Sequence, residues 1–224
     1  MTRRTRKRIA ILISGRGSNM AALIAAAIDP AFPAEIVGVV SNRADARGLE
    51  IAKTHNIPIK VISSRDYDGR EAHDAAIHEA ITGFKAEIVC LAGYMRLLTP
   101  DFVKKWKGRM INIHPALLPS FRGLDTHARA LASGVRIHGC TVHFVTPEMD
   151  EGPIIAQAAV PVLTDDTEET LGERVLKIEH RLYPLALRLV VEGRVRMSDG
   201  VAVFSDVEDE RRDLAIVSPG ERRS

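Results

Sequence analysis

Asn112 and His114 stand two positions apart at the end of an apolar run, in the stretch 111–119. Alternate residues of a strand point to the same face, so we expect the amide and the imidazole side by side. An amide N–H can stabilise an oxyanion, and an imidazole can move a proton. The alternative is a capped strand end with a hydrogen-bonded histidine. The two prolines that follow fix an extended loop, which favours a site.

A carboxylate that could pair with this imidazole is Asp150, in the predicted surface loop 146–153. Such a pair would raise the pKa of the histidine. An acid in a loop with glycine and proline is equally typical of a solvated turn. Spacing along the chain does not show that Asp150 reaches His114, and the same holds for His138 and His143. The chain has no Gly-x-Ser-x-Gly elbow, which disfavours a Ser-His-Asp hydrolase.

The segment 14–19, Ser-Gly-Arg-Gly-Ser-Asn, follows the first apolar run and opens a helical pattern. Backbone N–H groups at a helix N-terminus bind anions, and glycines let a phosphate approach closely. The alternative is a turn that needs glycine for its backbone angles. Met20 replaces the third glycine of the dinucleotide fingerprint, and no acid follows the second predicted strand, so NAD binding is disfavoured. Arg43 near that position keeps NADP as an alternative. A small phosphorylated metabolite fits better.

Composition excludes several classes of function. The 224 residues carry 31 Lys+Arg against 29 Asp+Glu and are 4% aromatic, which disfavours a nucleic-acid partner or a base-stacking platform. Two cysteines, Cys90 and Cys140, are too few for a disulfide framework or a cysteine zinc site, so we expect a reduced, cytoplasmic protein. We expect no metal, because no His-Glu-x-x-His occurs. We expect no membrane span, because no apolar stretch reaches about 18 residues.

These residues must be positioned by alternating strands and helices. Apolar runs predict strands at 9–13, 35–40, 58–62, 87–92 and 109–113. Between them, the patterns predict helices at 18–28, 46–55 and 65–81, and a short one at 100–106. This order predicts the α/β class, with a doubly wound, mostly parallel sheet. Ligands of such sheets bind at the carboxyl ends of the strands.

The C-terminal half predicts antiparallel strands at 138–145 and 154–162, after a short helix at 126–132. The longest helix is predicted at 167–191, with Thr167 and Thr170 as candidate caps, and a hairpin is predicted at 194–197 and 201–204. Without a repeat or a clear linker, 1–224 is expected to be a single domain with a core of roughly 8–197. The basic N-terminus, residues 3–8, and the tail after 204 are expected to be solvated, peripheral ends.

Taken together, the motifs resemble those of the phosphoribosylglycinamide formyltransferases, a family of folate-dependent formyltransferases. The matching stretches, in the family's order, are 13–19, 41–42, 91–96, 112–119, 138–145, 150–153 and 179–180. Each is a weak signal alone, and the ordered set is specific. The resemblance implies a Rossmann-like formyltransferase fold.

The resemblance also implies a reaction: transfer of the formyl group of 10-formyltetrahydrofolate to the amine of glycinamide ribonucleotide, in de novo purine biosynthesis. It implies these two small molecules as partners, no metal, and a monomer or a homodimer. In these roles Asn112 binds the oxyanion, His114 is the general acid/base and Asp150 supports the histidine. Such acyl-type transfer needs positioning and oxyanion stabilisation.

Binding residues follow from the same resemblance. The ribonucleotide phosphate is expected at Gly17, Ser18 and Asn19, and its amine at Glu179. The folate-binding residues are expected to be Arg70, Met95, Arg96, Leu97, Leu98, Asn112, Thr146, Pro147, Glu148, Met149 and Asp150. Without the resemblance, Arg70 and Glu179 would be interpreted as surface charges. Arg122, Pro147 and Glu151 depart from the family's pattern.

Three other functions share part of this pattern. Arg122 and the shared Asn-x-His…Asp centre also fit methionyl-tRNA formyltransferase, but that enzyme has a further C-terminal domain, and about thirty residues follow the last long helix here. A formyltetrahydrofolate hydrolase is expected to carry an N-terminal regulatory domain. A phosphoribosyl-binding module would leave Asn112, His114 and Asp150 without a task.

Overall fold

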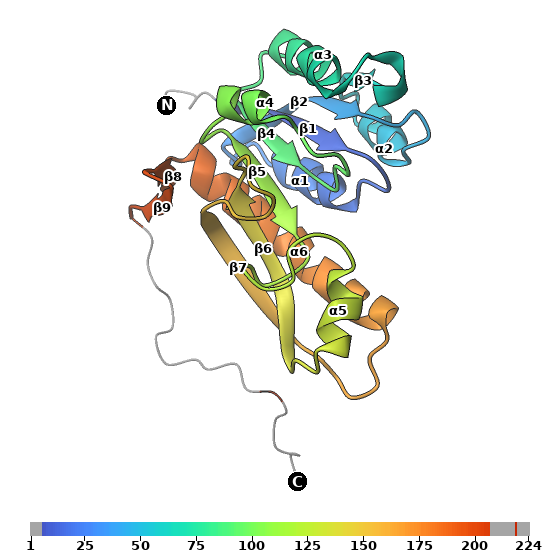
Figure 1. Cartoon of the computed structure of the whole chain (residues 1–224). Coiled ribbons are helices and arrows are strands. Elements are labelled where there is room, and N and C mark those ends of the chain that lie inside the picture. Colours follow the sequence, from blue (N-terminus) through green and yellow to red (C-terminus); the bar gives the residue numbers. More distant parts are fainter. Residues whose placement is uncertain (1–5, 207–217, 219–224) are drawn as a thin grey trace.

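The computed structural model describes residues 6–206 and residue 218. Its main feature is a seven-stranded sheet in the order β3-β2-β1-β4-β5-β6-β7 (Figure 1). The strands are β1 (Lys7–Ile13), β2 (Ala34–Ser41), β3 (Ile59–Val61), β4 (Ile88–Leu91), β5 (Met110–His114), β6 (Ile137–Phe144) and β7 (Ile154–Pro161). Strands β1 to β5 are parallel, and β6 pairs antiparallel with β5 and β7. The predicted mostly parallel sheet with antiparallel C-terminal strands is confirmed.

Helices cover both faces of this sheet (Figure 1). They are α1 (Ser18–Ile28), α2 (Gly48–Thr54), α3 (Arg70–Gly83), α4 (Pro100–Lys105), α5 (Thr126–Ala132) and α6 (Glu168–Val191), with a 3-10 turn η1 (Ser64–Asp66). Strands β8 (Val195–Ser198) and β9 (Val201–Phe204) form the predicted hairpin. Within residues 6–206, no helix, including the 24-residue α6, has a stretch apolar enough to span a bilayer.

Strand β1 is buried on both of its faces, and this explains why its sequence is continuously apolar. Ile9, Ile11 and Ile13 pack in one buried cluster with residues of α1 and α6. Ala10 and Leu12 face the opposite side, in a second cluster with residues of α3 and α4. Successive side chains of a strand alternate between faces, so a strand covered on both faces needs apolar residues at every position.

The helix predicted at 65–81 is wrong in one respect, because the structure divides it into η1 and α3. The break lies at Tyr67, which is extended, and at Gly69, whose φ of 95° precedes the first residue of α3. Glycine adopts positive φ without the steric cost that a Cβ brings. Helical periodicity does not register such a break, because the polar residues around it fit either conformation.

Hydrogen bonds stabilise helix α6 at its start and further along, at Tyr183. Thr167 and Thr170 form the predicted cap as a reciprocal capping box, since each side chain accepts from the backbone N–H of the other. Further along, the Tyr183 hydroxyl donates to the carbonyl oxygens of Leu91 and Ile111, at 2.9 and 3.2 Å. These bonds hold α6 against β4 and β5.

The basic N-terminus is only partly peripheral, which corrects our expectation for residues 6–8. Lys7 begins β1 and pairs with Glu87, and Arg8 pairs with Glu35 at 3.1 Å. The Arg6 guanidinium donates to the carbonyls of Ala27 and Ala34. The remaining parts of the expected peripheral ends, residues 1–5, 207–217 and 219–224, lie outside the described residues.

Candidate active site

Asn112 and His114 occupy the carboxyl end of β5, as their spacing predicts. The antiparallel neighbour β6 places His143 opposite Asn112 and Thr141 opposite His114. The sequence alone predicts no role for His143. The pairing register of β5 and β6 identifies it, and register is a property of the folded sheet.

His143 orients the Asn112 amide. Its Nδ1 lies 2.9 Å from the Phe144 carbonyl oxygen, and its Nε2 lies 3.2 Å from Nδ2 of Asn112. A carbonyl accepts only, so Nδ1 carries the proton and Nε2 accepts from the amide. Burial lowers the pKa of His143 and favours this neutral form. One amide hydrogen of Asn112 is thereby fixed on His143, which leaves the second free for a substrate oxygen.

The structure brings Asp150 to His114. Oδ2 of Asp150 lies 3.5 Å from Nδ1 of His114, and both side chains are largely buried. The other ring nitrogen of His114, Nε2, lies 2.9 Å from the Phe121 carbonyl oxygen. Oδ2 of Asp150 also accepts from the backbone N–H of Gly123 at 2.8 Å. An amide, an imidazole and a carboxylate therefore meet at one point between β5 and the β6–β7 loop.

The Gly17 turn lies at the carboxyl end of β1 and opens α1. Gly17 has a φ of 73°, and a Cβ there would lie 2.7 Å from Cα of Gly48, so the position requires glycine on both counts. No side chain caps α1 at this residue. The first N–H groups of α1 are thus free of a side-chain acceptor, the arrangement in which a helix N-terminus binds an anion.

Asn19 and Glu179 come together although 160 positions separate them. Nδ2 of Asn19 donates to Oε2 of Glu179 at 2.8 Å, so one amide hydrogen is used within the protein, and the second amide hydrogen and the backbone N–H remain for a phosphate. Burial raises the pKa of Glu179 to about 7, although the bond from Asn19 opposes the shift. Burial and the nearby Glu179 raise the pKa of the Cys140 thiol to about 12. Because Cys140 precedes Thr141, the partner of His114, α6 brings Glu179 to the same region of β6.

The expected folate residues lie on two segments beside this region. In the segment after β4, Met95 and Leu97 are 65% and 61% exposed, which leaves apolar surface for a ligand. Arg96 donates to Ser64 Oγ at 2.9 Å. Arg70 donates to the carbonyls of Leu97 and Leu98, at 3.2 and 3.3 Å, so part of its guanidinium holds this segment. The second segment is the loop from Thr146 to Asp150, with Met149 52% exposed.

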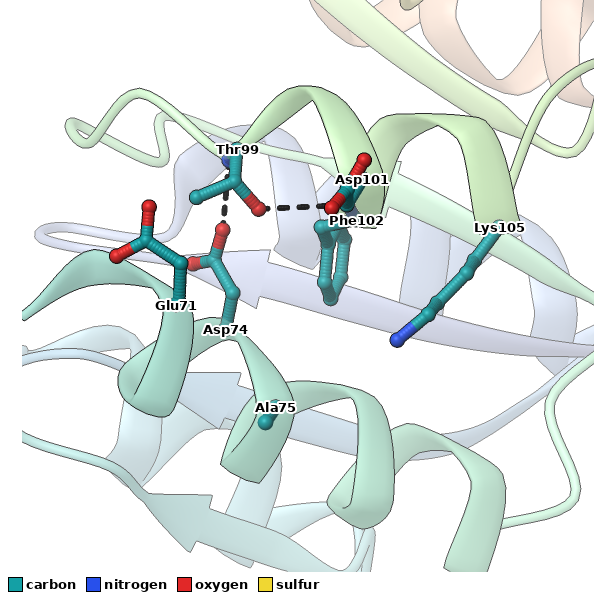
Figure 2. Close-up of a pocket in the computed structure, with 7 residues that line it drawn as sticks. All are labelled: Glu71, Asp74, Ala75, Thr99, Asp101, Phe102 and Lys105. Carbon is teal, nitrogen blue, oxygen red and sulfur yellow. Dashed lines mark hydrogen bonds between the residues drawn. The ribbon is translucent and has the colours of Figure 1, made fainter.

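Figure 2 shows how the end of the segment after β4 is held, in a pocket between α3 and α4. The buried Asp74 accepts from the backbone N–H of Thr99 at 2.6 Å, and Thr99 caps α4 by accepting from Phe102. None of the candidate site residues lines this pocket. These contacts hold the end of the segment that carries Arg96.

Metal ligation is not indicated among the described residues, where no group of three histidines, cysteines or acids has the geometry to hold an ion. Asn112, His114, His143 and Asp150 bond to one another or to the backbone, whereas Oδ1 of Asn19 is buried without a hydrogen-bond partner. What the site offers is hydrogen-bond donors for a developing oxyanion and an imidazole–carboxylate pair for a proton.

Comparison with known proteins agrees with this arrangement. The formyl transferase family matches residues 7–187. The chain is 43% identical over 194 residues to the phosphoribosylglycinamide formyltransferase of Escherichia coli, covering 87% of this chain and 92% of that protein. It is also 50% identical over 202 residues to the bovine trifunctional purine biosynthetic protein adenosine-3. That match covers 90% of this chain but only 20% of the longer protein.

A solved structure agrees in three dimensions. The crystal structure of the phosphoribosylglycinamide formyltransferase of Brucella melitensis is 57% identical, with a TM-score of 0.81, over 84% of this chain and 96% of that one. Sequence, fold and topology thus point to the same group of proteins. The chain belongs to the formyl transferase family.

Proposed function

We propose that this protein is a phosphoribosylglycinamide formyltransferase, which transfers the formyl group of 10-formyltetrahydrofolate to the amine of glycinamide ribonucleotide in purine biosynthesis. The observation that carries the proposal is the meeting of Asn112, His114 and Asp150 at the carboxyl end of β5. The family membership and the named relatives support it.

In the proposed reaction, Asn112, His114 and Asp150 each have one role. The lone pair of the substrate amine attacks the formyl carbon, and the carbonyl electron pair moves onto oxygen. The free amide hydrogen of Asn112 stabilises this oxyanion. His114, supported by Asp150, handles the proton that leaves the attacking nitrogen, and N10 of the folate gains a proton as its bond to carbon breaks. The carbonyl re-forms on the new amide, and tetrahydrofolate leaves.

The two substrates are assigned to opposite sides of this centre. The ribonucleotide phosphate is assigned to the backbone N–H groups of Gly17, Ser18 and Asn19, where the positive end of α1 favours an anion. Its amine is assigned to Glu179. A carboxyl with a pKa of about 7 is partly ionised at neutral pH, and a bound amine favours its charged form.

The folate is assigned to the segments on the other side. Met95 to Leu98 and Thr146 to Asp150 would enclose the pterin, and Arg70 and Arg96 would pair with the carboxylates. Both guanidiniums keep further N–H donors beyond the bonds they make within the protein.

The decisive experiment mixes the purified protein with both substrates and follows folate absorbance and formylated ribonucleotide. We expect tetrahydrofolate and formylated product in equal amounts, only when glycinamide ribonucleotide is present. Formate release without the ribonucleotide would instead indicate a hydrolase. Binding of both substrates without turnover would indicate a binding module.

A matched pair of variants separates the phosphate site from general damage. Gly17→Ala places a Cβ against Gly48 and in a positive-φ conformation, so it should abolish ribonucleotide binding. Gly83→Ala, where a Cβ meets nothing within 4 Å, should leave binding unchanged. Equal binding by both variants would reject the assignment of the phosphate.

A further inference from the structure

Phe121 lies in the stretch 115–125, which joins His114 at the end of β5 to α5. Its φ is 55°, in the left-handed region that bulky side chains rarely adopt. Such residues persist only where the surrounding structure holds them, and they gather at functional sites. The reaction outlined above gives Phe121 no task.

The backbone of residues 121–123 contacts both members of the imidazole–carboxylate pair. The carbonyl oxygen of Phe121 lies 2.9 Å from Nε2 of His114, and the N–H of Gly123 donates to Oδ2 of Asp150 at 2.8 Å. A carbonyl can only accept and a backbone N–H can only donate. His114 therefore carries a proton on Nε2, and Asp150 presents an accepting oxygen. The remaining ring nitrogen, Nδ1, faces that carboxylate at 3.5 Å, a distance too long for a strong hydrogen bond.

We propose that Phe121 is a positioning residue that fixes the tautomer of His114, so that the proton exchanged during formyl transfer is carried by Nδ1, beside Asp150. This inference rests on the proposed function for the reaction, but the tautomer it assigns is a property of the protein without substrate. The Nε2 proton is retained by the Phe121 carbonyl throughout.

The Phe121 ring is held from two sides, which explains how its backbone keeps this conformation. The ring of His138 on β6 meets it edge-on, with centroids 5.8 Å apart and planes at 77°. The guanidinium of Arg129 on α5 lies 5.8 Å from the ring centroid and also donates to the carbonyls of Arg122 and Leu124. A contact of this kind between a cation and an aromatic face is attractive.

The same segment is tied to the loop that carries Asp150. The Arg122 guanidinium pairs with the Glu151 carboxylate, next to the bond between Gly123 and Asp150. Arg122 and Glu151 are two of the positions that depart from the family's pattern, and the structure explains them together, as one ion pair. Movement of residues 121–123 therefore displaces His114 and Asp150 together.

Four titratable groups face His114 from the elements around it. They are Asp150 in the β6–β7 loop, His138 and His143 on β6, and His127 on α5. Burial, and then the neighbouring His127, lower the pKa of His138 to about 4, and burial lowers the pKa values of His143 and His127. The lowered pKa values favour the neutral form of these three imidazoles, and the Asp150 carboxyl is the acidic group that lies against His114, 3.5 Å from Nδ1.

The tautomer is measured directly in the ligand-free, ¹⁵N-labelled protein by long-range ¹H–¹⁵N correlation. The His114 signals are those that disappear in His114→Asn. We expect a protonated Nε2 and a pyridine-like Nδ1 once His114 is neutral. A neutral form with its proton on Nδ1 would overturn the inference. A protein with the expected tautomer but no formyl transfer would reject the proposed function alone.

Variants test whether Phe121 is responsible. Phe121→Ala keeps the carbonyl but removes the ring, and we expect mixed tautomers, a kcat at least about tenfold lower and a shifted pH profile of kcat. KM should stay within about twofold, because no substrate contact is removed. Phe121→Tyr, which keeps an aromatic ring, should show the wild-type tautomer, kcat and pH profile. Wild-type tautomer and pH profile in Phe121→Ala would overturn the inference.

The matched control is Phe32→Ala, which removes a buried ring that also lies under a guanidinium, that of Arg188 at 5.1 Å, away from the site. It should leave the His114 tautomer and the pH profile unchanged. If Phe121→Ala does not fold, Arg129→Gln is the second variant. It removes the guanidinium from the Phe121 ring and its bonds to the carbonyls of Arg122 and Leu124, while the ring stays. The His114 tautomer and the pH profile of kcat then test the inference.

Discussion

A neutral histidine sets the orientation of the Asn112 amide at this site. His143 is kept neutral by burial and bonds to the backbone through Nδ1, so it accepts one hydrogen of the Asn112 amide. That bond determines which way the amide faces. An oriented donor stabilises a developing charge without reorganising during the reaction, which is the basis of oxyanion-hole catalysis.

Replacing Asn112 with alanine tests the oxyanion donor. We expect kcat for Asn112→Ala to fall about 10²–10³-fold, the usual loss for one such donor. The buried Nε2 of His143 loses its donor as well, so stability should drop by about 1–3 kcal/mol. Steady-state rates well below the melting temperature separate the two effects. A kcat within about twofold of wild type would remove Asn112 from the mechanism.

Glu179 makes the stability of the protein depend on pH. Its folded pKa is about 7, against an ordinary value of 4.5, so between these values the folded state holds a proton that the unfolded state has released. Stability therefore falls as pH rises from about 4.5 to about 7, by up to about 3 kcal/mol from this group, and stays level above.

Glu179→Gln removes that titration and keeps an oxygen that accepts from Asn19. Urea unfolding at pH 5 and pH 8 measures the free energy of unfolding for both proteins. We expect the variant to gain stability relative to wild type between these two pH values. An unchanged difference would mean that Glu179 has an ordinary pKa in the folded protein.

At the scale of elements, α6 carries the buried acid to the site. Its start is defined by the capping box of Thr167 and Thr170, and by the ion pair of Asp166 with Arg174. The Arg174 guanidinium lowers the pKa of Asp166 well below its usual range. These contacts set where the helix begins, and Glu179 lies just over three turns later, which sets the face on which it meets Asn19.

Removing the cap should weaken the fold without touching the chemistry. Thr167→Ala is expected to lose about 1 kcal/mol of unfolding free energy, because the backbone N–H of Thr170 loses its side-chain acceptor. Thr54→Ala, which removes a hydroxyl bonded to Ile51 at the end of α2, is the comparison and should cost less. Equal losses, or a lower kcat for Thr167→Ala, would contradict this description of α6.

At the scale of the molecule, the site is shared among distant parts of the chain. The β1–α1 turn, β5, β6, the β6–β7 loop and α6 each contribute, and α6 packs on both α1 and the antiparallel strands. Tyr183 joins these parts, since its hydroxyl bonds to β4 and β5 through the carbonyls of Leu91 and Ile111. The distance between Glu179 and the β5 residues depends on this attachment.

Tyr183→Phe tests the attachment. The ring stays buried while the hydroxyl is lost, and we expect a stability loss of about 1–3 kcal/mol, because two buried carbonyls lose a donor. Tyr67→Phe, on the half-buried Tyr67 near α3, is the matched control and should be nearly neutral. A chemical-denaturation series on both variants measures the difference. Similar values would show that the hydroxyl bonds of Tyr183 contribute little.

Local patterns account for much of what was predicted. Two-residue periodicity placed Asn112 and His114 on one face of β5, and continuous apolar runs predicted the buried parallel strands. The threonine pair predicted the start of α6. These features depend on residues near one another in the chain, where backbone preference and burial act together. Gly69 is the exception, because a glycine that ends one helical segment and starts another resembles a glycine within a helix.

Contacts across the chain were decided by the tertiary structure. The bond of Asn19 to Glu179 spans 160 positions, and the pairing of Asn112 with His143 depends on strand register. The positive φ of Phe121 occurs where its ring contacts the His138 ring and the Arg129 guanidinium, two groups from other elements. The sequence by itself determined the strands, the helices and the chemical groups at their ends. Only the packed fold decided which groups meet, because hydrogen bonds and burial between distant residues exist only once the sheet has formed.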